Sequence, residues 1–264
     1  MEGSRYCMKL HFLGTCCGAE PIPDRRHASV LLECQDRLIW LDAGEACSIT
    51  GHTLGFDLLK TTDILISHCH MDHIGGLCNL LWTIRKLRFV KDRVPTYGEI
   101  GVYIPNPSTT KAVNMLLSHT EGNFNCDFPL SFHNVSDGMV FSHDGISVTA
   151  FHNTHLGDPT PDPWLSFSYR IEAEGKSIVY SGDVGSYTNL DAAIGAGCDA
   201  LLLETGHFTI DKAHDYVQTK NVGHLYFTHN GRAIINDYSG SLEKVNRLFN
   251  GNATICNDKM TVIV

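Results

Sequence analysis

Residues 63–76 read DILISHCHMDHIGG and decide how the rest of the chain is interpreted. A short apolar run, residues 64–66, comes directly before a cluster of metal-type ligands, and a pair of glycines follows. The cluster comprises His68, His70, Asp72 and His73. An apolar strand that ends in such residues presents them at its carboxyl end, before a helix, where open α/β sheets keep their functional sites. The stretch therefore predicts a buried strand, a functional loop and a helix, in that order.

The spacing within this loop suits a pair of metal ions. His68 and His70 can point the same way in an extended segment, because side chains repeat every second residue. Asp72 and His73, beyond the bend, are then free to face a second position. Neutral imidazole and carboxylate ligands suit zinc, and also manganese or iron. Cys69 lies between two histidines and is expected to point away from them.

Composition and charge limit the classes of function. Apolar content of 43% and charged content of 19% are ordinary for a soluble globular protein. A formal net charge of −9 argues against general nucleic-acid binding, because phosphate contacts need clustered Lys and Arg. No apolar run approaches the roughly 20 residues that span a bilayer, and the amino terminus lacks a signal-peptide pattern. With ten scattered cysteines and no CxxC pair, we expect a cytoplasmic protein in a reducing compartment.

The HxHxDH pattern of residues 68–73 resembles the metallo-β-lactamase fold superfamily. Residues 12–15, FLGT, followed by prolines, an arginine and the strand-like SVLLE, resemble its ribonuclease Z-like branch. Cys16 and Cys17 depart from that pattern, since small residues are usual there. The resemblance implies an α/β protein with a four-layer αβ/βα sandwich. Because no linker-like stretch divides residues 1–264, we expect one domain.

Four further apolar segments end in polar residues, as the segment before His68 does. The five segments read LIWLD at 38–42, DILISH at 63–68, SIVYSGD at 177–183, ALLLET at 200–205 and HLYFTH at 224–229. Apolar residues at helical spacing fill much of the intervening chain. We therefore expect the strands to deliver their polar residues to one edge of a sheet sandwich.

The resemblance also suggests roles for residues outside the histidine loop. Asp42 follows an early strand in a DxG pattern, which implies a supporting residue that holds the histidine loop by hydrogen bonding. A turn carboxylate with no link to the site is the alternative. The pattern VTAFxxxH, followed by SFSYRIE and GKSIVYSGD, favours His155 over His152 as a ligand. Asp183 in YSGD is implied to bridge two metals.

The implied cofactors are two divalent metal ions, with Zn²⁺ preferred and Mn²⁺ or Fe as alternatives. The first metal receives His68, His70 and His155, the second receives Asp72, His73 and His229, and Asp183 lies between them. The nucleophile would be a hydroxide that bridges the two ions, because paired cations lower the pKa of a shared water. Asp72 can orient or deprotonate that water as well as bind metal. His207 stands near where ribonuclease Z-like members carry a histidine that assists the leaving group, and a structural hydrogen bond is its alternative role.

These features predict a dinuclear metal phosphodiesterase that acts on a small-molecule or short nucleotide substrate. One alternative is hydrolysis of a carboxylic ester, lactone or thioester at the same site, and another is a non-catalytic metal-binding or sensing protein. A phosphate-bearing substrate would call for basic loops near the site, whereas an acyl substrate would tolerate the apolar neighbourhood of Trp164 and Phe167. Arg232 is a candidate contact for an anionic substrate, and an arginine that closes a turn is its alternative role.

The expected partners follow from the same features. Transfer RNA is not an expected substrate, because no Gly/Pro-rich basic arm is present and the overall charge is acidic. No membrane partner is expected. A homodimer is a further expectation, since members of the superfamily often pair. Residues 93–141 would shape the substrate pocket but are the hardest to interpret, and the proline-rich loop at 156–164 is expected to cover the site.

Overall fold

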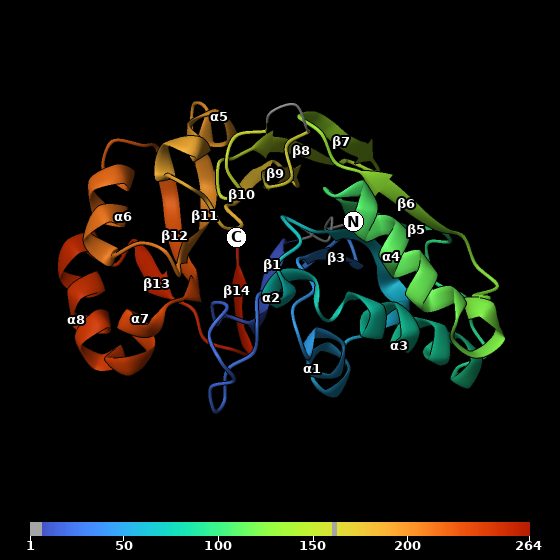
Figure 1. Cartoon of the computed structure of the whole chain (residues 1–264). Coiled ribbons are helices and arrows are strands. Elements are labelled where there is room, and N and C mark those ends of the chain that lie inside the picture. The colour runs from blue at the N-terminus through green and yellow to red at the C-terminus, as the bar shows by residue number, and fades with distance from the viewer. Residues whose placement is uncertain (1–6, 160–162) are drawn as a thin grey trace, which may run out of the picture.

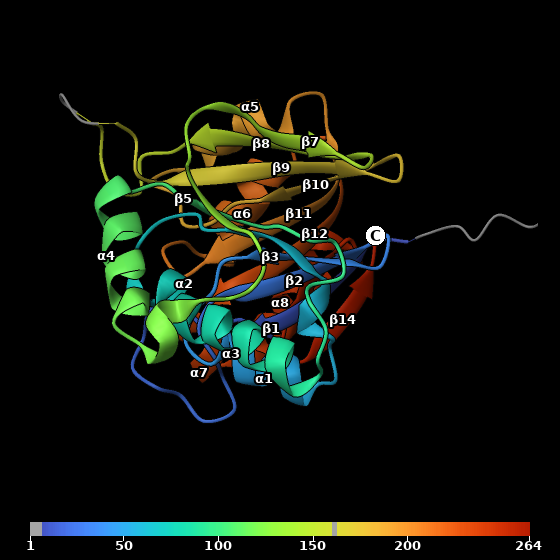
Figure 2. The same ribbon diagram turned by 90° about the vertical axis from the view of Figure 1, so that its right-hand side faces the viewer.

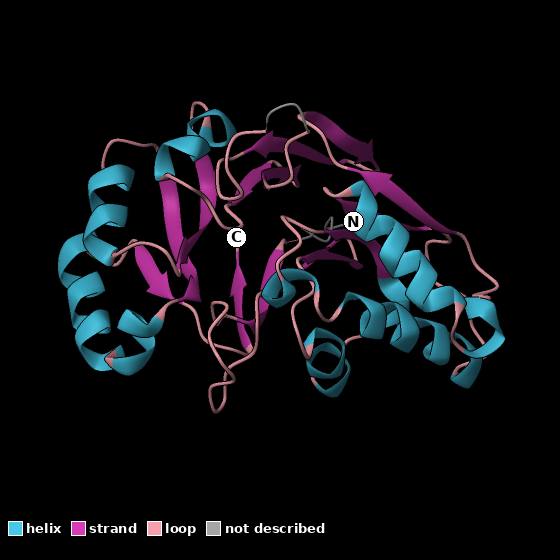
Figure 3. Cartoon of the chain, in the orientation of Figure 1, coloured by secondary structure: helices cyan, strands magenta, loops and turns pink. Residues whose placement is uncertain are grey.

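Two seven-stranded mixed sheets pack face to face, and helices cover the outer face of each sheet (Figures 1 and 3). The structure is a computed structural model that describes residues 7–159 and 163–264. The resulting order of layers is helices, sheet, sheet, helices, which is the expected αβ/βα sandwich. Figure 2 shows the strands of the two sheets stacked above one another.

The first sheet is built mainly from the amino-terminal half of the chain. Its strands, in spatial order, are β14 (Met260–Ile263), β1 (Lys9–Gly14), β2 (Ser29–Cys34), β3 (Arg37–Leu41), β4 (Thr61–Leu65), β5 (Ile100–Ile104) and β6 (Leu130–Asn134). Neighbours from β14 to β3 are antiparallel, and neighbours from β3 to β6 are parallel. The last strand of the chain therefore returns to pair with the first.

The second sheet repeats this arrangement. Its strands are β13 (Ala253–Ile255), β12 (Val222–Asn230), β11 (Cys198–Thr205), β10 (Lys176–Tyr180), β9 (Phe167–Ala173), β8 (Ile146–His152) and β7 (Gly138–His143). Strands β7 to β10 are antiparallel, and strands β10 to β13 are parallel. The parallel strands of both sheets carry the polar strand ends that the sequence indicates.

Helices bury the outer faces of both sheets. Those over the first sheet are α1 (Cys47–Thr53), α3 (Leu77–Val90) and α4 (Pro107–Ser118), and the short α2 (Met71–Ile74) lies within the histidine loop. Those over the second sheet are α5 (Asp191–Ile194), α6 (Ile210–Val217), α7 (Arg232–Asn236) and α8 (Tyr238–Phe249). Within the described residues, no helix has the length and apolar content needed to cross a membrane.

Strand β3 shows why these strands are apolar along their whole length. Ile39 and Leu41 belong to the core between the two sheets, whereas Leu38 and Trp40 belong to the core under the helices. Successive side chains of a strand point to opposite faces, so a strand covered on both faces must be apolar throughout. The run LIWL therefore indicates a strand in the middle of the sandwich.

Residues 93–141 contain more regular structure than the sequence suggests. Besides β5 and α4, this region forms a 3₁₀ turn (Glu121–Phe124), β6 and β7. Strands β6 and β7 lie at sheet edges, and several of their side chains are exposed. An edge strand that is open to solvent carries polar residues, which weakens the apolar signal. Of the expected loop at 156–164, residues 160–162 lie outside the described part of the chain.

Candidate metal centre

The seven predicted metal ligands lie together near the carboxyl ends of strands β4, β8, β10 and β12. His68 and His70 follow β4, and Asp72 and His73 are in α2, directly after them. The second sheet supplies the others, with His155 after β8, Asp183 after β10 and His229 near the end of β12. Both sheets therefore contribute to a single cluster, as the sequence predicts.

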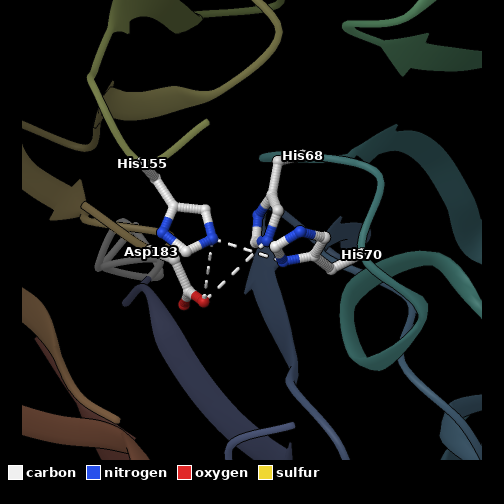
Figure 4. A group of neighbouring side chains, drawn as sticks. All are labelled: His68, His70, His155 and Asp183. Atoms are coloured by element: carbon white, nitrogen blue, oxygen red, sulfur yellow. Dashed lines mark hydrogen bonds and ion pairs between the residues drawn. The ribbon is translucent and has the colours of Figure 1, made fainter. Parts of the chain in front are cut away.

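One group of ligand atoms comes from His68, His70, His155 and Asp183 (Figure 4). The Nε2 atoms of His68 and His155 lie 3.8 Å and 3.7 Å from Asp183 Oδ2. His155 Nε2 is also 3.2 Å from His70 Nδ1. One ligand atom from each residue lies within 4.8 Å of the others, so the four atoms can surround one ion.

A second group lies on the other side of Asp183. Asp183 Oδ1 is 3.3 Å from His73 Nε2 and 3.2 Å from His229 Nδ1. Asp72 Oδ2 lies 3.3 Å from His73 Nε2 and 3.1 Å from His229 Nε2. The two oxygens of Asp183 thus face different groups of ligands, as a carboxylate between two ions would.

Buried atoms without hydrogen bonds support a fit to metal ions. Within the described residues, His68 Nε2 and His229 Nδ1 are buried and have no hydrogen-bond partner. Buried polar atoms in proteins are normally hydrogen bonded, to protein or to ordered water, so such orphans need an explanation. Here they converge with carboxylate oxygens, and this combination of nitrogen and oxygen donors suits zinc, manganese or iron. The residues present therefore fit divalent metal ions.

The protonation states of two side chains also suit metal binding. Burial lowers the pKa of His68 well below its usual value, so its imidazole is neutral. Burial alone would raise the pKa of Asp183, but the imidazoles of His229 and His73 outweigh it and hold that pKa far below the usual range. A neutral imidazole and an ionised carboxylate are the forms that coordinate a cation.

Asp42 holds the histidine loop from behind. Its Oδ2 atom is 2.7 Å from His73 Nδ1 and accepts hydrogen bonds from Ser67 Oγ and the Tyr180 hydroxyl, each at 2.7 Å. Its Oδ1 atom accepts a hydrogen bond from the Ser67 backbone N–H at 2.6 Å. A proton on His73 Nδ1, donated to Asp42, leaves Nε2 free to face the centre. The supporting contact expected of Asp42 is therefore present.

The structure shows which of the two candidate histidines, His152 and His155, lies in the ligand cluster. His152 Nδ1 lies 2.6 Å from Asp137 Oδ2, and its ring stacks on Trp164 with centroids 3.9 Å apart. His155 instead reaches the ligand group around Asp183. Cys69 packs against the core under the helices, so it points away from the histidines as expected.

Sequence reasoning assigned no role to Glu204, which proves to be the partner of His207. The Glu204 carboxylate is fully buried, accepts hydrogen bonds from the backbone N–H groups of Val184 and His207, and lies 3.1 Å from His207 Nδ1. This hydrogen bond raises the pKa of His207 to about 9. His207 is therefore a cation at neutral pH. The sequence signal for this pair was an acidic residue at the end of a strand, three residues before a histidine.

The ligand cluster opens into a cavity of about 660 Å³. It is lined by Cys17, Gly18, Ala19, His70, Asp72, Asp183, Gly206, His207, His229, Arg232 and Ala233. Among the described residues, Arg232 is the only Lys or Arg in this lining, and it forms an ion pair with Glu20. Trp164 and Phe167 do not line the cavity, and its lining by the described residues contains no large apolar side chain.

Comparisons with known proteins agree with this architecture. Residues 8–214 match the family model described as anti-Pycsar protein Apyc1. The chain is 27% identical over 193 residues to ribonuclease Z of Mycobacterium marinum, an alignment that covers 69% of this chain and 65% of that protein. It is also 26% identical over 255 residues to ribonuclease Z of Mycobacterium sp. (strain KMS), covering 84% of each chain.

Solved structures establish the fold. The metallo-β-lactamase fold protein YhfI from Bacillus subtilis superposes with a TM-score of 0.74 at 17% identity, covering 98% of this chain and 100% of that one. Human tRNase Z, short form, gives a TM-score of 0.71 at 22% identity, covering 96% and 98%. The two-sheet architecture is therefore the metallo-β-lactamase fold, as the sequence motifs imply.

Replacing Tyr180 with Phe is expected to weaken metal binding without changing any predicted ligand. The substitution removes one hydrogen bond to Asp42, so His73 is held less firmly. Loss of such a supporting contact lowers metal affinity about tenfold or more. Zinc affinity, measured by competition with a chelating dye, tests this.

Tyr216→Phe is the matched control, because its hydroxyl also donates to an aspartate, Asp191, but outside the site. Equal zinc affinities in the two variants would show that the Tyr180 hydroxyl does not support the centre.

Proposed function

We propose that this chain, which belongs to the anti-Pycsar protein Apyc1 family and has the metallo-β-lactamase fold, is a metal-dependent hydrolase and, more narrowly, a phosphodiesterase with two divalent metal ions. The proposed ligands of the first ion are His68, His70 and His155, and those of the second are Asp72, His73 and His229. Asp183 would bind both ions. Zinc is the preferred metal for these donors, with manganese or iron as alternatives.

The lining of the cavity is the observation that carries this proposal. Arg232 and the cationic His207 both line the cavity that holds the ligand cluster, where their positive charge favours an anionic substrate. An acyl substrate would call for apolar contacts, but Trp164 stacks on His152 and Phe167 is buried between the sheets. The chemistry of the cavity therefore favours a phosphodiester over a carboxylic ester, lactone or thioester.

We assign different roles in hydrolysis to the residues around the cavity. Two divalent ions held by the ligand cluster would supply an activated water and neutralise charge on the phosphoryl group. Burial alone would raise the pKa of the Asp72 carboxylate, but His229 and His73 outweigh it and hold that pKa well below the usual range. Asp72 is therefore ionised and can accept a hydrogen bond from the attacking water. His207, protonated and oriented by Glu204, can donate a proton to the leaving oxygen.

The substrate is proposed to be small or a short single strand. Arg232 alone provides Lys or Arg charge in the cavity lining of the described residues, and the whole chain carries a net charge of −9. A long polyanion would need more extended basic contacts. Transfer RNA is therefore not the substrate we propose, although the curated relatives are ribonucleases Z.

The direct test is hydrolysis of bis(p-nitrophenyl) phosphate by zinc- and manganese-reconstituted protein. We expect a metal-dependent initial rate that falls by about a hundredfold or more in Asp72→Ala, because this change removes both a ligand and the group that orients the water. No rate with either metal at full occupancy, together with hydrolysis of p-nitrophenyl acetate, would replace the phosphodiesterase by an esterase. No rate on either substrate would favour a non-catalytic role.

A leaving-group comparison tests His207. His207→Ala should slow hydrolysis of a 3′,5′-cyclic nucleotide, whose alkoxide leaving group needs a proton, by about a hundredfold. The same variant should lose much less activity on bis(p-nitrophenyl) phosphate, whose phenolate leaves unaided. Equal losses on both substrates would instead indicate a structural role for His207.

Arg232 is expected to bind the substrate anion rather than take part in bond breaking. Arg232→Ala should raise KM for bis(p-nitrophenyl) phosphate about tenfold with kcat nearly unchanged, because it removes one charged hydrogen bond to substrate. Glu20→Gln should lower KM, since it frees Arg232 from its ion pair. Arg247→Ala on α8 makes the same change of charge away from the cavity, and an equal rise in KM there would show that only overall charge matters.

A further inference from the structure

A second cavity lies at the opposite edge of the sandwich from the ligand cluster. It has a volume of about 300 Å³ and forms where β3, β4 and β5 begin, close to β6 and β7. It is lined by Arg37, Thr62, Asp63, Tyr97, Glu99, Gly101, Tyr103, His133, His143 and Asp144. The proposed hydrolysis uses none of these residues.

The carboxylate of Asp63 is the unusual group in this cavity. Asp63 lies in the middle of β4 and is only 2% exposed. Its Oδ1 atom accepts a long hydrogen bond of 3.3 Å from the Tyr103 hydroxyl. Its Oδ2 atom has no hydrogen-bond partner in the described residues, and His143 Nε2 lies 3.7 Å away. A buried carboxylate oxygen normally accepts a hydrogen bond, so Oδ2 lacks a hydrogen-bond donor although His143 lies at ion-pair distance.

Aromatic rings form the walls of the cavity. His133 stacks on Tyr103 with centroids 4.9 Å apart, and His143 stacks on Phe141 with centroids 4.6 Å apart. The ring of Tyr103 keeps its place because Gly101 has no side chain, and a Cβ there would be 2.8 Å from the ring. A ligand in this cavity would therefore meet flat aromatic faces beside a carboxylate.

The charges in the cavity favour a cationic ligand. Three carboxylates line it, from Asp63, Glu99 and Asp144, against one guanidinium. That guanidinium, of Arg37, pairs with Asp144 at 2.8 Å and lies over the ring of Tyr97 at 4.0 Å. No other Lys or Arg among the described residues lines the cavity, so the Asp63 carboxylate has no lysine or arginine partner.

The geometry points to a binding site for a small organic ammonium ion that carries an aromatic group. The ammonium would donate a hydrogen bond to Asp63 Oδ2, and its aromatic group would pack against the rings of His133 and His143, which line the same cavity. A charged hydrogen bond to a buried carboxylate and cation–π contact with aromatic faces are the interactions that recognise such ligands. This site is independent of the metal centre and of the proposed hydrolysis.

Benzylamine, which is an ammonium ion at neutral pH, is the probe for this site. Calorimetric titration of the metal-loaded protein should show saturable binding, whereas benzyl alcohol, its neutral analogue, should not bind. Asp63→Asn should weaken benzylamine binding about tenfold or more, since it removes the charged acceptor. Thermal melting would show that this variant is folded.

Amines also bind metals, so Asp72→Asn serves as the matched variant at the metal centre. Binding that is lost in Asp63→Asn but kept in Asp72→Asn places the ligand in the second cavity. Binding that is kept in Asp63→Asn but lost in Asp72→Asn overturns the proposal. Absence of binding to the parent protein overturns it as well. If Asp63→Asn fails to fold, Glu99→Gln at the exposed rim replaces it, with weaker binding expected and unchanged binding counting against the site.

Discussion

The Asp42 carboxylate is the interaction on which the candidate centre depends. It is completely buried at the end of β3 and receives hydrogen bonds from the histidine loop and from Tyr180 of the facing sheet. A buried charge is strongly unfavourable unless donors surround it, and here the donors come from both sheets. The contact therefore links the position of His73 to the packing of one sheet on the other. Any shift of the sheets would disturb this network and the histidine loop together.

The pairing of the two sheets explains how distant parts of the chain form one cluster. The first sheet supplies the histidine loop after β4, and the second supplies His155, Asp183 and His229. Each sheet begins with antiparallel strands and ends with parallel ones, so the parallel strands bring their carboxyl ends to the same edge. The opposite edge contributes nothing to the ligand cluster. The cavity at that edge contains Asp63, which belongs to β4, the strand that leads to His68.

The cavity at the metal centre combines fixed charge of both signs. Asp72 and Asp183 remain ionised, while His207 is kept protonated by a carboxylate that is itself anchored by backbone N–H groups. Such an arrangement holds charges in place before substrate arrives, which is the condition for electrostatic stabilisation of a reaction. Glu204 is fully buried and hydrogen bonded to His207, so it is placed to orient that side chain.

Local sequence by itself determined the buried strands, the histidine loop and the identity of the candidate ligands, because alternation, apolar runs and ligand types are properties of neighbouring residues. It also indicated Asp42, through its position at a strand end. The motif resemblance favoured His155 over His152, and the tertiary structure gives the physical reason, because His155 reaches the ligand cluster whereas His152 stacks on Trp164. Only the tertiary structure decided the Glu204–His207 pair, the exclusion of Trp164 from the cavity, and the Asp63 oxygen that lacks a hydrogen-bond donor. Each of these depends on which side chains from distant segments meet, and that is fixed by the packing of one sheet on the other.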